Sequence, residues 1–331
     1  MGYTKFITTW NTFVPFIRIL DPASNLCHTC KKNTDHIRGL TNVSEEEKLR
    51  VLQAHQEQKS KAKQERKLNN SAVDESKNFP LQPQALIQAN PPCSVEGTMH
   101  YSFDYAQQVH FPCNTQQPGP IYFKTPRKCG IFGVCCEAIP RQINFLIDES
   151  VQTGKGGNTT ISYLHNFFEN HGLGETNVHL HADNCGGQNK NNYVLWYLCW
   201  RVLHGLHRNI DYAFLIAGHT KFSPDWCFGL MNKKLRRTFT SSLFDIMQAV
   251  DSSTTTNVNY GKLVGLHDGT VLVKTYQWDE HLSTYFRKLK GISRYHHFRF
   301  SEDSPGKVFY RKYADSPEIG ARCFSRLRRA G

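Results

Sequence analysis

Three aspartates lie at the ends of predicted strands or just beyond them. Asp104 lies late in "HYSFDYAQQ", Asp183 closes "HLHAD", and Asp225 follows an apolar strand after a short loop in "AGHTKFSPDW". Neighbouring strands of one sheet would bring these carboxylates together although they are distant in the chain. Carboxylate oxygens are hard ligands that suit Mg²⁺ or Mn²⁺. Two such ions about 4 Å apart can activate an attacking oxygen and stabilise the leaving one in phosphodiester chemistry.

The same aspartates also have a structural interpretation. Aspartates at strand ends often cap helices, and Asp225 stands where a cap could be. This alternative is weaker for Asp104, because Ser102, Asp104 and Ala106 share one face of their strand. An acid on a sheet face needs a partner that satisfies it.

Other polar residues flank these aspartates. His181 lies two residues before Asp183 on the same strand face, and His219 lies in the loop before Asp225. Either histidine could bind a scissile phosphate or transfer a proton, although His181 is equally consistent with a hydrogen-bonded histidine at a strand end. Asn184 and Gln188 could orient the site or contact backbone phosphates.

Two cysteines near the N-terminus have the spacing of zinc ligands. Cys27 and Cys30 form a C-x-x-C pair, and a closed site needs two more ligands, for which the candidates are His28, His36, Cys93 and Cys113. The eleven cysteines are spread along the chain, unlike the dense pattern of a small secreted disulfide scaffold. They indicate a reducing compartment in which most cysteines are small buried apolar residues.

The charge balance favours a polyanionic partner. The 331 residues include 40 Lys+Arg against 28 Asp+Glu, a formal net charge of +12, and nucleic acid is the first candidate partner. Basic residues gather in 232–238, 286–300 and 322–331, and the aromatic residues among those of 286–300 suit contacts with bases. The alternative is an ordinary solvated basic surface.

The sequence shows no secretory or membrane-targeting pattern, and we expect a nuclear or cytoplasmic protein. The sequence contains no run of about 18 apolar residues, which a transmembrane helix would need, so we expect no membrane partner. The N-terminus lacks a compact apolar region followed by a small-residue cleavage site, so we expect a protein that is not secreted.

Composition divides the chain into five parts. Residues 1–43 are a mixed region with the C-x-x-C pair, and 44–78 predict a charged helix that begins with a capping box of Ser44 and Glu47. This helix is either solvated or a coiled-coil partner, and the fading apolar stripe favours the first. Residues 79–96 are a Pro-rich linker, 97–315 a globular domain and 316–331 a basic tail.

The globular part alternates between strands and helices. We expect strands at 98–106, 119–128 and 130–139, a helix at 158–172, a strand at 177–183, a helix at 190–207, a strand at 210–218 and a helix at 223–238. This order predicts a three-layer α/β domain with a mixed sheet.

This order and several motifs mark a family resemblance. With "LHADNCGGQNKNN", the order resembles the RNase H-like fold of DDE transposases and retroviral-type integrases, in which an aspartate ends the fourth strand. "GHTKFSPDWCFGLMNKKLRR" resembles the part that supplies their third acid. Residues 97–315 are similar to a transposase-derived domain family of animal genomes, with "FDYAQQVHFP", "QQPGPIYFKTPRK", "GVCCEAIPRQINFLIDE", "HADNCGGQNKN", "GHTKFSPD" and "YADSPE".

The resemblance implies a function and a set of site residues. It implies DNA as the partner, a homo-oligomer, the nucleus as the location, and Asp104, Asp183 and Asp225 as ligands of two Mg²⁺ or Mn²⁺ ions in DNA cleavage or strand transfer. The chain departs from the pattern because transposases commonly place a Glu one turn into the last helix, where Gly229 falls, so Asp225 must serve instead. Two alternatives stay open: a domesticated DNA-binding or scaffolding protein without turnover, and a zinc-dependent interaction module centred on the N-terminal cysteines.

Overall fold

The computed structural model falls into two compact units, Met1–His55 and Gln56–Gly331. It describes residues 2–14, 16, 27–39, 44–81, 85–113, 119, 124–151, 154–216, 218–219 and 221–325. The first unit contains α1 (Tyr3–Phe13), α2 (His28–Gly39) and the start of α3 (Glu45–Ser76), which continues into the second. As predicted, Ser44 caps α3, because its Oγ accepts a hydrogen bond from the Glu47 N–H at 3.3 Å.

One mixed sheet forms the centre of the second unit. In the described part of the chain it has ten strands in the order β10-β9-β8-β6-β5-β1-β3-β4-β7, and β2 pairs with β3. β1 pairs antiparallel with β3 and parallel with β5, and β5 pairs parallel with β6. The strands are β1 (Val95–Tyr105), β2 (Val109–Phe111), β3 (Arg127–Cys136), β4 (Arg141–Asp148), β5 (Glu175–Ala182), β6 (Asn209–Phe214), β7 (Asn259–Leu263), β8 (His297–Ser301), β9 (Lys307–Arg311) and β10 (Ile319–Arg322).

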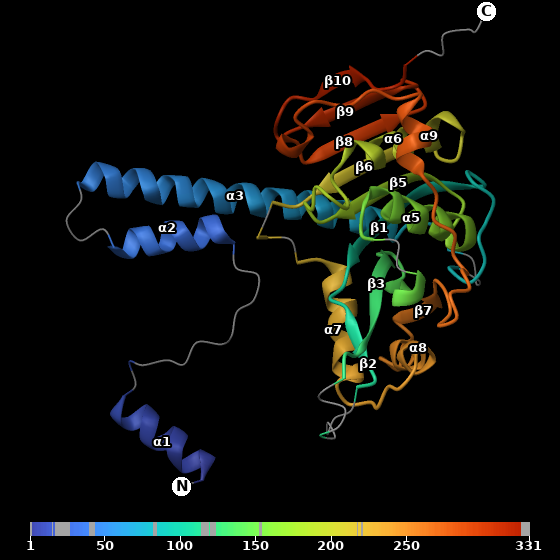
Figure 1. The fold of residues 1–331 in the computed structure, drawn as a ribbon. Helices are drawn as coiled ribbons and strands as arrows, with labels where there is room; N and C mark the ends of the chain where they lie inside the picture. Colours follow the sequence, from blue (N-terminus) through green and yellow to red (C-terminus); the bar gives the residue numbers. More distant parts are fainter. Residues whose placement is uncertain are drawn as a thin grey trace, which may run out of the picture. The chain divides into compact units, whose positions relative to one another are not determined.

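Helices cover both faces of this sheet. α5 (Gly157–His171), α6 (Asn192–Leu203) and α9 (Trp278–Ser283) pack in one apolar core, and α7 (Ser223–Leu235) and α8 (Leu243–Asp251) in another (Figure 1). Two short 3₁₀ helices are Glu149–Val151 and Ile292–Arg294. The predicted three-layer α/β arrangement is therefore confirmed. No helix among the described residues is long and apolar enough to cross a membrane.

The two faces of β1 differ in polarity: one carries aromatic side chains and the other carries polar ones. Tyr101 and Phe103 are fully buried on the side of α5, where the rings of Tyr101 and Phe167 lie 5.1 Å apart. Successive side chains of a strand point to opposite faces, so Ser102 and Asp104 point to the face that carries α7. Opposite Asp104, Gly133 has no side chain, and a Cβ there would lie 2.8 Å from the ring of Phe228 on α7. Glycine thus allows α7 to pack close to this acid.

The second half of α3 packs on the same polar face. Glu65 is buried, and its Oε2 lies 2.6 Å from Nε2 of His297 on β8 while its Oε1 accepts from the Ala314 N–H at 2.7 Å. The prediction of a solvated helix is therefore wrong for this half. Its buried contacts are polar, so a search for an apolar stripe misses them.

The predicted strands 119–128 and 130–139 are not two separate strands among the described residues, because β3 (Arg127–Cys136) spans the junction between them. The segment 119–128 is not the second long strand: residues 124–126 are irregular, β3 begins at Arg127, and 120–123 lie outside the described residues. The third long strand is β4, "RQINFLID", which is almost wholly buried between β3 and β7. β4 alternates between polar and apolar residues only over 142–145 and then continues with Leu146 and Ile147, because both of its faces are covered.

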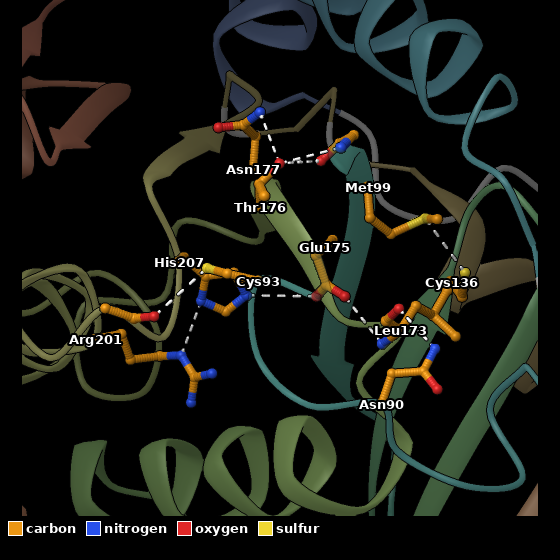
Figure 2. Close-up of polar contacts among 12 residues, drawn as sticks. Asn90, Cys93, Met99, Cys136, Leu173, Glu175, Thr176, Asn177, Arg201 and His207 are labelled. Atoms are coloured by element: carbon orange, nitrogen blue, oxygen red, sulfur yellow. Dashed lines mark hydrogen bonds and ion pairs between the residues drawn. The ribbon is translucent and has the colours of Figure 1, made fainter. Parts of the chain in front are cut away.

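A buried polar network joins α6 to the start of β5. Arg201 Nε donates to His207 Nδ1 at 3.1 Å, and His207 Nε2 lies 3.4 Å from Oε1 of Glu175 (Figure 2). The other oxygen of Glu175 accepts from the Leu173 N–H at 2.9 Å. Burial lowers the pKa of His207, so a neutral imidazole lies between a buried cation and a buried anion.

Replacing Glu175 with Gln should destabilise the protein by about 3 to 5 kcal/mol, because the buried charge of Arg201 loses its counter-charge. Equilibrium unfolding in urea measures this loss. Glu96→Gln is the matched control: Glu96 forms an exposed ion pair with Arg208, and its loss should cost less than about 1 kcal/mol. Equal effects of the two variants would contradict a structural role for the network.

Candidate functional site

The register of β1 and β5 places Asp104 beside Asp183. Phe103 pairs with Ala182 at the end of this parallel ladder, so the next residues along the two strands are the two aspartates. The carboxyl ends of parallel strands lie at the same edge of a sheet. Asp225 lies in the first turn of α7, which packs against β1 and β3. Two neighbouring strands and one helix thus carry the three acids.

The carboxylates act on one another electrostatically. Burial, with the negative charges of Asp183 and Asp225, raises the pKa of Asp104 to about 7, although the Tyr105 N–H and the charge of Lys155 act in the opposite direction. The three acids do not form a closed ligand set, because their oxygens do not all lie within 4.8 Å of one another, although all three belong to the described residues. The fold therefore gathers the charges without bringing the oxygens to one point.

Each carboxylate is held through one of its oxygens. Asp104 Oδ1 accepts from the Tyr105 N–H at 2.8 Å, and Asp183 Oδ1 accepts from the Cys185 N–H at 3.0 Å and from Asn189 Nδ2 at 2.7 Å. Asp225 Oδ2 accepts from the Phe222 N–H at 3.1 Å. These bonds engage only one oxygen of each acid, and carboxylate oxygens are in general the hard ligands that Mg²⁺ and Mn²⁺ prefer.

Asp225 also has the structural role that its position suggests. Its bond to the Phe222 N–H caps α7, so the helix-cap interpretation is correct for this residue. Ser223 is the first residue of α7 and not its cap: its Oγ donates to Oε2 of the half-buried Glu137 at 2.5 Å. A capping oxygen and a metal-binding oxygen can belong to one carboxylate.

The turn after β5 is held by its own side chains. Asn184 Nδ2 donates to the Leu215 carbonyl, and Asn184 Oδ1 accepts from Lys190 Nζ at 2.8 Å. The Gln188 carbonyl accepts from Asn191 Nδ2 at 3.0 Å. The side chain of Asn184 is therefore engaged in the turn, and the structure gives it no free amide for phosphate.

Sequence reasoning missed Asn189 and Lys190. Asn189 is fully buried and positions Asp183, and its backbone carbonyl accepts from Tyr212 Oη at 2.9 Å. Lys190 is also buried, and burial lowers its pKa to about 8. The run "NKNN" directly before an apolar helix could have indicated them. A short turn there cannot expose all four polar side chains, so some of them must be buried.

The two histidines predicted near the acids lie in different environments. His181 is 2% exposed, and burial, with the charges of His297 and Arg66, lowers its pKa to about 3. A neutral histidine without solvent access does not suit phosphate binding or proton transfer. The His219 carbonyl accepts from Arg66 of α3 at 2.8 Å, and burial, with the charges of Arg66 and Lys59, lowers the pKa of its imidazole.

The predicted zinc ligands of the N-terminal region belong to the first unit. Cys27 is buried just before α2 and Cys30 lies in its first turn, with their sulfur atoms within 4.8 Å of each other. The Cys30 N–H lies 3.4 Å from the Cys27 sulfur. This pair can supply two of the four ligands of a zinc site.

A basic segment is anchored beside the turn that carries Asp183. The backbone of Leu289 makes two hydrogen bonds with the side chain of Asn192, and Lys190 Nζ donates to the Ser293 carbonyl at 3.2 Å. This arrangement holds residues 286–294 against the start of α6. Four cationic side chains of the segment are exposed, those of Arg287, Lys288, Lys290 and Arg294.

Among the described residues, the fold does not connect the other two basic clusters with the three acids. Residues 232–235 form the end of α7 and 236–238 the turn after it, whereas Asp225 lies at the start of the helix. In the third cluster, residues 326–331 lie outside the described part of the chain. Arg299, within the predicted 286–300 cluster, is paired with Glu318. The anchored segment 286–294 is therefore the cluster that the fold connects with the acids.

Asp104→Asn should change how stability depends on pH. Between about pH 4 and about pH 7 the folded protein retains a proton on Asp104 that the unfolded chain has released, so the free energy of unfolding falls as the pH rises through this window. The variant should lack up to about 3 kcal/mol of this fall. Urea unfolding at pH 5 and pH 8 measures it, with the exposed Asp315→Asn as control. Identical profiles for wild type and Asp104→Asn would contradict the site electrostatics.

Comparison with known proteins gives one family. Neither the curated proteins nor the solved structures contain a match to the chain. One family model, described as a domain of unknown function (DUF7869), matches residues 125–317, more than half of the chain. The matched region contains Asp183, Asp225 and the anchored basic segment, and it begins after Asp104. The chain therefore belongs to the DUF7869 family.

Proposed function

We propose that the protein is a metal-dependent polynucleotidyl transferase or nuclease that acts on DNA, with Asp104, Asp183 and Asp225 as its metal ligands. The observation that carries this proposal is the adjacency of Asp104 and Asp183 at the end of a parallel strand pair, with Asp225 close enough to raise the pKa of Asp104. Like charges gathered at a partly buried site are costly unless a cation is bound there.

The topology supports an RNase H-like domain. β1, β3 and β4 form an antiparallel run, and β5 and β6 extend the sheet in parallel from the other side of β1. β5 is the fourth long strand, and Asp183 directly follows its last residue. The second acid of the transposases that the sequence resembles has this same place, and the third acid follows on the next helix but one, as Asp225 does on α7.

The residues of the chain have distinct tasks in this proposal. Bound Mg²⁺ or Mn²⁺ supplies the positive charge that lowers the barrier to phosphodiester cleavage. Asn189 holds Asp183 in place, and Gly133 lets α7 bring Asp225 toward the strand ends. The exposed cations of residues 286–294 bind DNA phosphates beside the acids. The proposed location is the nucleus, and the proposed active form is a homo-oligomer.

A DNA-binding protein without turnover is the second candidate. One observation favours it: the oxygens of the three acids do not all lie within 4.8 Å of one another, and Asp225 already caps α7. The basic segment would serve this function equally well. A zinc-dependent interaction module is the third, favoured by the Cys27 and Cys30 sulfurs within 4.8 Å of each other in the first unit.

Asp183→Asn should abolish DNA cleavage and strand transfer without weakening DNA binding. The purified protein with Mn²⁺ is incubated with supercoiled plasmid and with linear duplexes, and nicked, linear and joined products are quantified. We expect a loss of at least about 100-fold, the scale of removing a preorganised electrostatic group. The fold should persist because an asparagine oxygen can still accept from Asn189 and the Cys185 N–H.

Asp315→Asn is the matched control, because it removes the same charge at an exposed position away from the acids. It should keep wild-type activity. A wild-type protein that binds DNA and cleaves none of these substrates would favour the second candidate. Activity that persists in Asp183→Asn would exclude the proposed ligand set.

Replacing both Lys288 and Lys290 with Ala should weaken DNA binding in a salt-dependent way. Two lost phosphate contacts should lower the slope of log K against log salt concentration by about 2. Fluorescence anisotropy with a labelled duplex at several salt concentrations measures this slope. Lys274→Ala with Lys307→Ala, both exposed elsewhere, is the matched control; an equal effect of this pair would show non-specific electrostatics.

A further inference from the structure

A cavity that is partly open to solvent lies between the second half of α3 and the polar face of the sheet. Its volume is about 270 Å³, and its walls come from α3, β1, β5, β6 and β8. Three histidines line it, His100 of β1 and His179 and His181 of β5. All of these elements belong to the unit Gln56–Gly331. The cavity is separate from the predicted carboxylate ligands, none of which lines it.

The sheet places these three histidines on one face. His179 and His181 are two residues apart on β5, so their side chains point to the same side. His100 pairs directly with His179 across the parallel ladder. The ring centre of His100 lies 6.2 Å from that of His179 and 6.4 Å from that of His181. Two alternate residues of one strand and one residue of its neighbour thus form a triangle of imidazoles.

Several nitrogen atoms of this triangle lack a partner. Among the described residues, nothing hydrogen-bonds either ring nitrogen of His181 or Nδ1 of His100. Both side chains are only 2% exposed, and a buried polar atom without a partner is costly. These nitrogen atoms lie in the walls of a cavity, which indicates that the cavity holds something that binds them.

The remaining nitrogen atoms have the partners that metal-binding histidines usually have. His100 Nε2 donates to Asn69 Oδ1 at 3.1 Å, which leaves the Nδ1 lone pair for a ligand. His179 Nδ1 lies 3.4 Å from the carboxylate of Asp211 on β6, which leaves Nε2. A carbonyl or carboxylate that accepts the second N–H fixes the tautomer and the orientation of a ligating imidazole.

We propose that His100, His179 and His181 form a binding site for a borderline divalent transition-metal ion, of which Zn²⁺ is the first candidate. Imidazole nitrogen suits Zn²⁺, whereas the carboxylates beyond the end of β5 suit harder ions. The ligand nitrogen atoms of the three histidines do not all lie within 4.8 Å of one another, so the rings have to move inward to reach the Zn–N distances of about 2.0 to 2.1 Å at one ion. Glu75 of α3, whose Oε2 lies 3.8 Å from His179 Nε2, or a water completes the ligand set.

Zinc binding to a variant that lacks both N-terminal cysteines tests this site. The full-length chain with Cys27→Ser and Cys30→Ser is titrated with Zn²⁺ against a chromophoric chelator at neutral pH. We expect one bound equivalent. In this background His100→Gln, His179→Gln and His181→Gln should each weaken binding by more than about tenfold. His281→Gln, at an exposed position, is the matched control and should leave the affinity unchanged.

Two further measurements keep the result decisive. His179 is the most accessible of the three, with its side chain 24% exposed, so His179→Gln should fold even where the buried variants do not. The visible spectrum of the Co²⁺ form should show a four-coordinate site without a sulfur charge-transfer band. Asp183→Asn should retain the bound Zn²⁺, which separates this inference from the proposed nuclease function. No bound Zn²⁺ in the double-serine chain, or unchanged affinity in His179→Gln, would overturn the proposal.

Discussion

The parallel register of β1 against β5 is the constraint on which the rest of the second unit depends. It pairs His100 with His179 and Ser102 with His181, and it ends with Asp104 beside Asp183. A shift of one residue would move every one of these side chains to the opposite face, into the aromatic core around Tyr101 and Phe103. The apolar side of β1 therefore fixes the register, and the polar side follows from it.

The helices that cover this polar face of the sheet have to supply hydrogen-bond partners for its buried polar groups. α7 brings Ser223 to Glu137, whose other oxygen accepts from Ser102, and α3 brings Glu65 to His297. Most buried polar groups of the face are paired in this way. Exceptions are Asp104, whose pKa is raised by burial and by its acidic neighbours, and the ring nitrogens of His100 and His181 in the cavity that lack a partner in the described part of the chain. Such exceptions are typical of places where a ligand completes the structure.

The two proposed metal sites would use different chemistry on one sheet face. The acids offer hard oxygen ligands at the open end of the strands, close to the anchored basic segment, whereas the histidines offer nitrogen ligands inside the cavity under α3. Only Ala182 lies between His181 and Asp183, so the two proposed sites lie close together at the end of β5. For a family described only as a domain of unknown function, the two proposed sites can be tested by DNA cleavage and by Zn²⁺ binding.

Local sequence patterns are enough to predict the class of fold, the helix α3 with its Ser44 cap, the strands β1, β5 and β6, and three aspartates at strand or helix ends. These features rest on local periodicity, capping and turn residues, which short stretches of chain express. Such patterns did not reveal β4, the packing of α3 or the three-histidine cavity. β4 is buried on both faces and alternates over only half of its length, and α3 packs through the polar side chain of Glu65, so a search for one apolar face detects neither contact. His100 and His179 are 79 positions apart, and only the pairing of β1 with β5 makes them neighbours. Tertiary structure decided these points because they depend on which strands pair, in which register, and not on any local pattern.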